Sequence, residues 1–566
     1  MNASNQKPKP PPQDQMALGI LKNVPLIYDG NGVYVDAAAK GYRNRLLLVP
    51  SADFVEWLSG QVYTTYKSIL DLNIVKKIIP LIRMTARTTG IQSEVHKRFA
   101  FHDDKLYIDI GDDTFGMVEV APGSWKITTN TAVYFHRSKT VLPLATPDPT
   151  GDPFALFDLI NIKDKGQQLL VLVWLCASVI GNIQRPMLLL IGKHHSGKTM
   201  AGRILRSLFD NNAPLELSVG TKEDDVVLNL FHNAIPFFDN LSPITKAISG
   251  KFCTAVTGAG YAKRILYTDM DQISITYQRP IILTAIDVPS QEEDFQDRLI
   301  RIPMGQIGGR EMVSEREVVT AFEQKRGAIL GGLLNALSRA MRMKGNLNLA
   351  EKSRFGDFEE WGAAISIALG CDPDAFMEAM GAAKKQLALD KALKDPVIRA
   401  IDALLVGQPG QQWAGSTTEL FSALEPYEPE FPSGYWPSSA EGLGKKLPGA
   451  RAGLSELGIS VSEPSDKNSG RIRTIVKRQQ VQKEYLHPWQ RCLDCKEFTK
   501  VPYSTDGCCA EQEDITITSA EAHDANCCIN FIRRSGNTLI ESSESDEERS
   551  SPQVDDFDSG YKSVFI

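Results

Sequence analysis

Hydrophobic positions in the middle of the chain follow two alternating patterns. Apolar runs of strand length occur at 187–191, 234–238 and 280–285, and segments with helical spacing separate them. Strands that alternate with helices are typical of a largely parallel β-sheet. A longer apolar run, 169–180, is shorter than the roughly 18 residues that a membrane span needs, so we expect a helix buried against the sheet. The pattern predicts an α/β core over residues 151–310.

The pattern changes on either side of this core. Residues 16–150 contain alternating runs such as KLYIDI, separated by GDD and APGS turn signals. They predict a mixed α+β region of small hairpins without a catalytic constellation. Residues 311–392 predict a helical lid, because Ser314 and Glu317 form a capping box before a helix with one apolar face.

Residues 393–480 predict a winged helix. Two helical stretches, TTELFSALE and EGLGKKL, precede GISVS and RIRTIVKR, which indicate a two-stranded hairpin. Lys445 and Lys446 fall on the second helix, and Arg471 and Arg473 fall on the hairpin. We expect these four side chains to bind DNA phosphates, which position a protein without specifying bases.

Cysteines are concentrated in residues 485–533, which hold six of the nine. Cys492 and Cys495 form a CxxC pair, and two CC pairs follow. One cysteine from each later pair would complete a tetrahedral thiolate site for Zn²⁺. A small segment this poor in apolar residues needs such a staple to fold. The other candidate ligands are Cys508, Cys527, His487 and His523.

The two ends of the chain differ from the rest in composition. Residues 1–15 are proline-rich and lack an apolar core, so we expect a flexible leader that is neither a signal peptide nor an anchor. The net charge is −7, and residues 541–560 carry eight acidic residues and one basic residue, so the remainder is close to neutral. We expect residues 534–566 to form an acidic disordered tail. These features predict a cytoplasmic protein without membrane contact.

The segment GKHHSGKT, between the apolar run 187–191 and an amphipathic helix, matches the phosphate-binding pattern G-x-x-x-x-G-K-[ST]. In such a loop backbone N–H groups surround phosphates, the lysine reaches the terminal ones, and the hydroxyl binds Mg²⁺. We therefore expect ATP to bind here. The predicted binding residues are Gly192, Lys193, His194, His195, Ser196, Gly197, Lys198, Thr199 and Met200.

A second element of this site is the stretch IPFFDN, an apolar run that ends in Asp239. We expect Asp239 to share the Mg²⁺ with Thr199. The next residue is Asn240, and an amide is not a base at neutral pH. Either Asn240 positions the attacking water or another carboxylate serves, so the base is unassigned.

The succession GKHHSGKT, FFDNLSPI, TGAGYAKRILYTD, QRPIILTAI and DFQDRLIRI resembles bacterial and phage ATPases of the primase-helicase type. These are carried on mobile elements and related to superfamily 3 and AAA+ helicases. The resemblance covers about residues 34–478. It implies an α/β, P-loop AAA+-like core with Lys198 and Asp239 as catalytic residues.

The resemblance also implies a ring. Arg298 would be an arginine finger that reaches a neighbouring subunit's nucleotide, in a homo-oligomer that is expected to be a hexamer. Lys263 and Arg264 would lie near a hairpin that grips single-stranded DNA. From the residues alone, a salt bridge from Arg298 to Asp297 or Glu293 is an equal alternative.

Two further positions depend on resemblance. Where the family usually has asparagine after the third strand, this chain has Thr284, whose hydroxyl is shorter and has one donor with which to contact phosphate or water. The cysteine-rich segment resembles small phage-encoded zinc modules, which selects Cys509 and Cys528 as partners of Cys492 and Cys495.

The leading hypothesis is a DNA-dependent ATPase, a helicase or translocase in replication of a phage, plasmid or integrated element. It would use ATP, Mg²⁺ and Zn²⁺ and act on single-stranded or forked DNA, with priming left to a separate primase. The alternative is an ATP-switched DNA-binding or assembly factor with weak hydrolysis, which Asn240 and Thr284 favour. A small-molecule P-loop kinase fits poorly, because such enzymes need neither a winged helix nor a zinc module.

Overall fold

The computed structural model divides the chain into two units, residues 1–498 and 499–566. It describes residues 10–30, 32–37, 45–129, 133–220, 222–264, 272–308, 313–345, 353–372, 374–429, 436–462 and 473–477, and the backbone of 498–500, 507–509 and 516–517. Within these residues no helix is long and apolar enough to cross a membrane.

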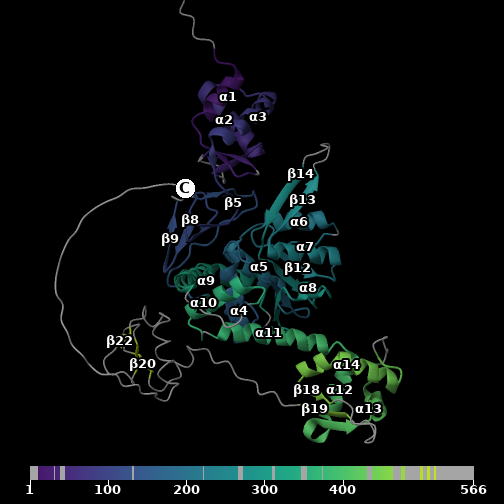
Figure 1. Cartoon of the computed structure of the whole chain (residues 1–566). Coiled ribbons are helices and arrows are strands. Elements are labelled where there is room, and N and C mark those ends of the chain that lie inside the picture. Colours follow the sequence, from purple (N-terminus) through teal and green to yellow (C-terminus); the bar gives the residue numbers. More distant parts are fainter. Residues whose placement is uncertain are drawn as a thin grey trace, which may run out of the picture. The chain divides into compact units, whose positions relative to one another are not determined.

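A four-stranded sheet lies at the centre of the first unit (Figure 1). Its strands are β11 (Met187–Ile191), β12 (Phe237–Leu241), β15 (Ile282–Ala285) and β16 (Leu299–Pro303). All neighbouring strands are parallel, in the order β12-β15-β11-β16. The predicted parallel α/β core is confirmed. The predicted run 234–238 was placed too early, because pairing with β15 begins only at Phe237 and the strand continues past Asp239.

Both faces of this sheet are covered, which explains why β11 is apolar at every position. Leu188 and Leu190 join the hydrophobic core on one face, and Leu189 joins a second core on the other. Helices α4 (Lys165–Ser178) and α5 (Lys198–Phe209) contribute to the first core. Helices α6 (Glu223–His232), α7 (Lys246–Thr257) and α8 (Glu293–Gln296) contribute to the second. Helix α4 is the predicted buried helix.

A hairpin follows α7. Strands β13 (Ala259–Arg264) and β14 (Gln272–Tyr277) pair antiparallel, with Lys263 opposite Ile273 and Arg264 opposite Gln272. The backbone places both basic residues toward the tip of this hairpin.

The region before the core contains two parts. The first has helices α1 (Gln13–Leu21), α2 (Ala52–Tyr66) and α3 (Leu72–Thr89), and a sheet of β1 (Leu26–Tyr28), β2 (Val33–Asp36), β3 (Leu46–Val49) and β4 (Ile91–Gln92). The second has the short pair β5 (Val95–His96) and β10 (Tyr134–Phe135), and the meander β6 (Phe99–His102), β7 (Lys105–Asp109), β8 (Met117–Ala121) and β9 (Ser124–Thr128). The meander was predicted as hairpins, whereas the three helices were not anticipated.

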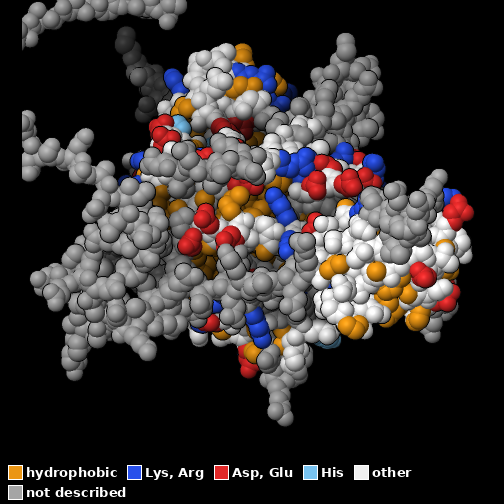
Figure 2. All heavy atoms as spheres, turned by 60° about the horizontal axis from the view of Figure 1, so that its bottom comes forward, with side chains coloured by type: hydrophobic (Ala, Val, Ile, Leu, Met, Phe, Trp, Pro, Cys, Tyr) orange, Lys and Arg blue, Asp and Glu red, His pale blue; other side chains and the backbone are white. Residues whose placement is uncertain are grey.

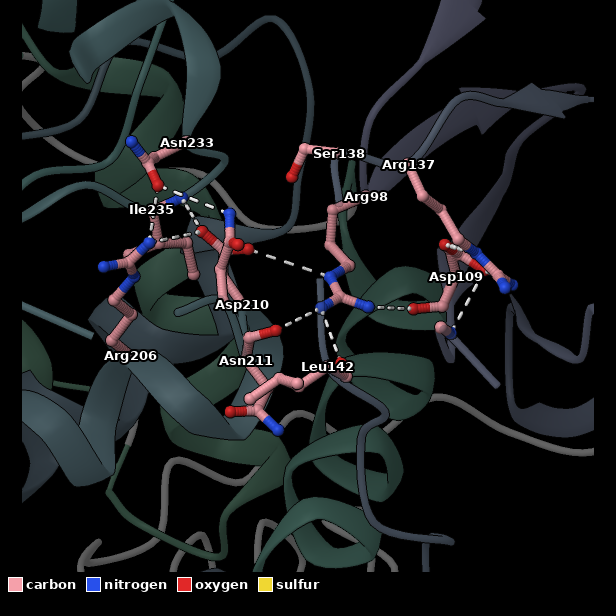
Figure 3. Close-up of polar contacts among 12 residues, drawn as sticks. Arg98, Asp109, Arg137, Ser138, Leu142, Arg206, Asp210, Asn211, Asn233 and Ile235 are labelled. Atoms are coloured by element: carbon pink, nitrogen blue, oxygen red, sulfur yellow. Dashed lines mark hydrogen bonds and ion pairs between the residues drawn. The ribbon is translucent and has the colours of Figure 1, made fainter. Parts of the chain in front are cut away.

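A buried polar network joins the meander to the core (Figure 3). Arg98 lies in the bend before β6, and its guanidinium donates to the carbonyl oxygens of Asp109 at 3.0 Å and of Asn211 at 2.9 Å. It also forms a 3.7 Å ion pair with Asp210, the residue that follows α5. Arg137 forms a bidentate pair with the Asp109 carboxylate at 2.6 and 2.8 Å. The network therefore ties the end of α5 to the meander.

After the sheet come the helices of the predicted lid, the first of which packs against the 3₁₀ turn η1 (Pro153–Asp158) from before the sheet. They are α9 (Glu315–Met343), α10 (Gly356–Ala368) and α11 (Ala375–Ala392). The capping box of Ser314 and Glu317 at the start of α9 is confirmed.

Residues 396–477 form a cluster of helices with a small sheet. The helices are α12 (Pro396–Val406), α13 (Thr417–Leu424) and α14 (Ala440–Glu456), with the 3₁₀ turns η2 (Pro409–Gln411) and η3 (Glu425–Tyr427). The strands β17 (Gln412–Gly415), β18 (Ile459–Val461) and β19 (Arg473–Lys477) pair antiparallel in the order β17-β19-β18. The expected two-stranded hairpin has a third strand, because β17 pairs with the far edge of β19.

The second unit contains strands β21 (Gly507–Cys509) and β22 (Thr516–Ile517), which pair antiparallel, and β21 also neighbours β20 (Phe498–Lys500). The predicted zinc ligands Cys492, Cys495 and Cys528 lie outside the described residues, and only the backbone of Cys509 is described. Residues 1–9 of the predicted leader 1–15 and the tail 534–566 also lie outside, whereas residues 13–15 of that leader belong to helix α1. Among the residues whose side chains are described, no cluster of metal-ligating residues occurs.

Candidate functional site

The loop between β11 and α5 is shaped by its glycines. Gly197 has φ of 81° at the start of α5, a left-handed conformation that glycine adopts without strain. A Cβ on Gly192 would lie 2.3 Å from the carbonyl oxygen of Met304, so a side chain does not fit there. The first and last glycines of the sequence pattern are thus required by backbone geometry.

Lys198 extends over the inside of the loop. Its Nζ donates to the carbonyl oxygens of Gly192 at 2.7 Å and Lys193 at 2.9 Å, and to Ser196 Oγ at 3.2 Å. Burial lowers the pKa of Lys198, and the Asp239 carboxylate acts in the opposite direction. The amine is therefore held inside the loop and close to the second predicted element.

Thr199 and Asp239 are brought together as predicted. Thr199 Oγ1 lies 3.0 Å from Asp239 Oδ1 and 3.1 Å from Oδ2. Two neighbouring ligands of an octahedral Mg²⁺ at about 2.1 Å are themselves about 3 Å apart. The two oxygens thus have the chemistry and the spacing for a shared Mg²⁺.

Thr284 has a role that sequence reasoning missed. It is 1% exposed, and its Oγ1 donates to Asp239 Oδ1 at 2.6 Å. Thr284 Oγ1 also accepts a 2.7 Å hydrogen bond from the backbone N–H of Asn240. The hydroxyl therefore fixes the carboxylate that faces Thr199. Only the pairing of β12 with β15 brings these residues together, so no local signal could have indicated it.

Asn240 does not lie as a strand residue normally does. Its φ is 52°, and its side chain is exposed. The backbone ladder between β12 and β15 is irregular at this point, between Phe238 and Leu241. The described contacts assign no base to the site.

A segment after β16 also holds the loop and was not anticipated. The backbone N–H of Ile307 donates to the carbonyl of His195 at 2.9 Å, and Gln306 Nε2 donates to the carbonyl of His194 at 3.3 Å. His194 and His195 themselves are exposed. These contacts use backbone carbonyls, which carry no sequence signature.

Arg298 is 9% exposed and pairs with Asp294 on α8, both through the carboxylate and through a 2.7 Å hydrogen bond to the carbonyl oxygen. The salt-bridge alternative gave Asp297 or Glu293 as the partner. That choice was wrong, because one turn of helix places Asp294 next to Arg298. Among the residues that the structure describes, no hydrogen bond or ion pair joins Arg298 to the loop 192–199.

The predicted DNA contacts are separate from the loop. Lys445 pairs with Glu441 at 2.7 Å on the exposed side of α14, while Lys446 is half-buried. Arg473 lies on β19, and Arg471 lies outside the described residues. Figure 2 shows basic and acidic side chains intermixed on the face that it presents, in keeping with a near-neutral body.

Two consecutive regions match models of one protein family. Residues 154–386 match the actinomycete integrative conjugative element replication protein, and residues 397–488 match the AICE RepA C-terminal domain. The first region contains the loop, Asp239, Thr284 and Arg298. The matches indicate a replication protein of a mobile element, which confirms that part of the sequence-based resemblance. A comparison with curated proteins gave no match.

Solved structures with a similar arrangement include helicases. The active helicase Cch of SCCmec type IV has 10% identity and a TM-score of 0.37, covering 68% of this chain and 78% of Cch. The A-form apo NrS-1 C-terminal region has 12% identity and a TM-score of 0.36, covering 83% of this chain and 100% of that one. These are distant likenesses and carry no argument about the site.

Proposed function

We propose that the chain is an ATPase that couples hydrolysis to movement along, or unwinding of, DNA in replication of an integrative conjugative element. The observation that carries this proposal is the convergence of Lys198, Thr199 and Asp239 at the carboxyl end of a parallel sheet. Lys198 would stabilise charge on the terminal phosphates, and Thr199 and Asp239 would hold the Mg²⁺. Mg²⁺ when bound neutralises charge that develops on the phosphate oxygens.

The proposal extends to assembly. Arg298 would reach the nucleotide of a neighbouring subunit in a hexameric AAA+-like ring, and this requires it to leave Asp294. The hairpin with Lys263 and Arg264 would contact single-stranded or forked DNA. The helices and sheet of residues 396–477 would act as a winged helix, with Lys445, Lys446 and Arg473 facing phosphates.

The remaining predictions belong to the same proposal. The cysteine-rich segment would bind Zn²⁺ through Cys492, Cys495, Cys509 and Cys528. Priming would come from a separate primase, and the protein would act in the cytoplasm. The predicted domain boundaries at residues 150, 310, 392 and 480 stay a prediction.

An assay of ATP hydrolysis with single-stranded DNA, duplex DNA and RNA tests the proposal. We expect single-stranded DNA to raise the rate severalfold, and light scattering to detect a ring that forms with nucleotide. A rate that no nucleic acid changes, together with no strand displacement, would contradict the motor.

A second candidate is an ATP-switched assembly factor with weak hydrolysis. The contacts of Thr284 favour it, because its one donor is already used on Asp239 and is not free for water or γ-phosphate. Slow turnover that DNA leaves unchanged, combined with nucleotide-dependent assembly, would favour the switch over the motor.

Replacing Thr284 by valine tests how Asp239 is held. Valine keeps the shape but leaves Asp239 Oδ1 and the Asn240 N–H without this partner. We expect about a tenfold fall in hydrolysis, equal to about 1.4 kcal/mol, and a higher Mg²⁺ concentration for half-maximal rate. Thr284→Ser keeps the hydroxyl and should retain most activity. Equal rates for the valine and serine variants would exclude this role.

A further inference from the structure

A cavity of about 1400 Å³ lies apart from the phosphate loop. Its wall includes the bend before β6, the end of α4, Phe231 at the end of α6, and the root of the β13–β14 hairpin, where Gly258 precedes β13 and Tyr277 ends β14. None of residues 192–200 lines it. The function proposed above makes no use of this cavity.

Three cationic side chains line it without a carboxylate in hydrogen-bond contact, among the residues that the structure describes. Lys97 Nζ donates to the carbonyl oxygen of Phe231. Arg279 donates to the carbonyls of Leu230, Gln278 and Phe231 at 3.1, 2.9 and 3.3 Å. Arg185 donates to the carbonyls of Ser178, at 3.5 Å, and Ile180. The hydrogen-bond acceptors of these three side chains are therefore backbone carbonyl dipoles, and the Asp210 carboxylate acts on Lys97 and Arg279 without a hydrogen bond.

Hydrogen bonds to the last carbonyl groups of helices explain part of this arrangement. Cations are favoured where the last carbonyls of a helix lack partners. Arg279 already donates a hydrogen bond to each of the Leu230 and Phe231 carbonyls at the end of α6. Lys97 on the same Phe231 carbonyl is redundant for that purpose, and the ammonium has two further N–H donors.

Charge around Lys97 is unbalanced. Burial, followed by repulsion from Arg279, lowers the pKa of Lys97 to about 7. Asp210 is the carboxylate that acts in the opposite direction, and it is already shared by Arg98 and Arg206 at 3.7 Å each. The carboxylates on the cavity wall are Asp29, Glu94 and Asp357, which are half-buried or exposed.

Arg185 is a buried cation on the same wall. It is 3% exposed, and its buried Nε has no hydrogen-bond partner among the described residues. A desolvated donor without an acceptor costs about 1–3 kcal/mol. An anion in the cavity would bring acceptor oxygens to a wall that both Arg185 and Lys97 line.

We propose that this cavity binds a phosphate group, and that Lys97, Arg185 and Arg279 supply its positive wall. A phosphate offers several acceptor oxygens and negative charge, which is what the wall lacks. The root of the β13–β14 hairpin favours a phosphodiester of a single nucleic-acid strand over free phosphate. Tyr28, Tyr34 and Phe101 on the same wall offer aromatic faces for bases. The choice of a nucleic acid rests on the proposed function, whereas the anion site does not.

Lys97→Met in the full chain tests the proposal. We expect a fluorescein-labelled single strand to bind about fivefold more weakly at 0.1 M salt, with the slope of log affinity against log salt reduced by about 0.7, the value for one phosphate contact. Lys126→Met is the matched control, because this lysine is 66% exposed and pairs with Glu119 outside the cavity. The control should change affinity less than twofold. Melting temperature and hydrolysis without DNA should be unchanged in both variants.

A second measurement uses the unaltered chain and does not depend on how the variant folds. Reductive methylation of Lys97, followed by mass spectrometry, should slow severalfold when single-stranded DNA binds. Protection by DNA but not by inorganic phosphate supports the nucleic-acid source, and protection by inorganic phosphate alone supports a site for a free anion. No protection by either, with unchanged affinity of Lys97→Met, overturns the site. Protection of Lys97 without stimulation of hydrolysis would leave the cavity intact and contradict only the motor.

Discussion

Lys198→Ala is expected to reduce ATP hydrolysis by at least 100-fold, because the loop loses the cation that would stabilise the terminal phosphates. Nζ of Lys198 lies within 3.2 Å of three acceptors of the loop and near Asp239. Alanine cannot stabilise charge on the terminal phosphates, and the loss of one such group costs about 10²–10³ in kcat. Release of phosphate by the purified variant, with and without single-stranded DNA, measures the effect.

Lys193→Ala is the matched control. This lysine lies in the same loop but is exposed, so the variant should keep most of the activity. Both variants should melt near the temperature of the unaltered chain. The loop's shape depends on Gly192 and Gly197, and residues 306–307 hold the loop through its backbone carbonyls. A Lys198→Ala variant that hydrolyses ATP at more than a tenth of the original rate would place the catalytic charge elsewhere.

The shape of the loop between β11 and α5 could be predicted because its information is local. A buried strand, two glycines, a lysine and a hydroxyl lie within a few residues of one another, and the backbone has little freedom to place them differently. The contact of Thr199 with Asp239 also followed, since the loop before Thr199 leaves the carboxyl end of β11 and Asp239 lies on β12 of the same parallel sheet.

Other features depend on contacts between distant segments. Thr284 reaches Asp239 only through the register of β15 against β12. The partner of Arg298 is decided by one turn of α8, which was too short to be recognised. Helix α3 has buried positions at Val75, Ile78, Ile82 and Ala86, a helical repeat that was present in the sequence and was not used.

The cationic wall illustrates the same limit. Lys97, Arg185 and Arg279 come from three separate segments, and nothing in their neighbours along the chain distinguishes them from surface residues. Their unusual property is the absence of a carboxylate in contact among the described residues. Only the packed structure reveals such a feature.

Asp210→Asn is expected to destabilise the core by about 3 kcal/mol, because it removes the charge that two buried arginines share. Asp210 is 2% exposed and lies 3.7 Å from Arg98 and from Arg206. Its Oδ2 accepts a 2.8 Å hydrogen bond from the backbone N–H of Ile235, which asparagine can still accept. Burial already lowers the pKa of Arg98, and Asp210 opposes that shift, so the variant leaves a buried cation less compensated.

Urea unfolding followed by tryptophan fluorescence measures this loss, because Trp174 is fully buried in the core that α5 shares. The control is Asp287→Asn, since Asp287 pairs with Lys394 at 2.9 Å between half-exposed side chains. Such a surface pair contributes about 0–1 kcal/mol. Equal midpoints for the two variants would show that the Arg98 network contributes little. The negative charge of Asp210 also reduces the positive potential of the cavity wall. Asp210→Asn should therefore raise the affinity of the cavity for phosphate, whereas Lys97→Met should lower it.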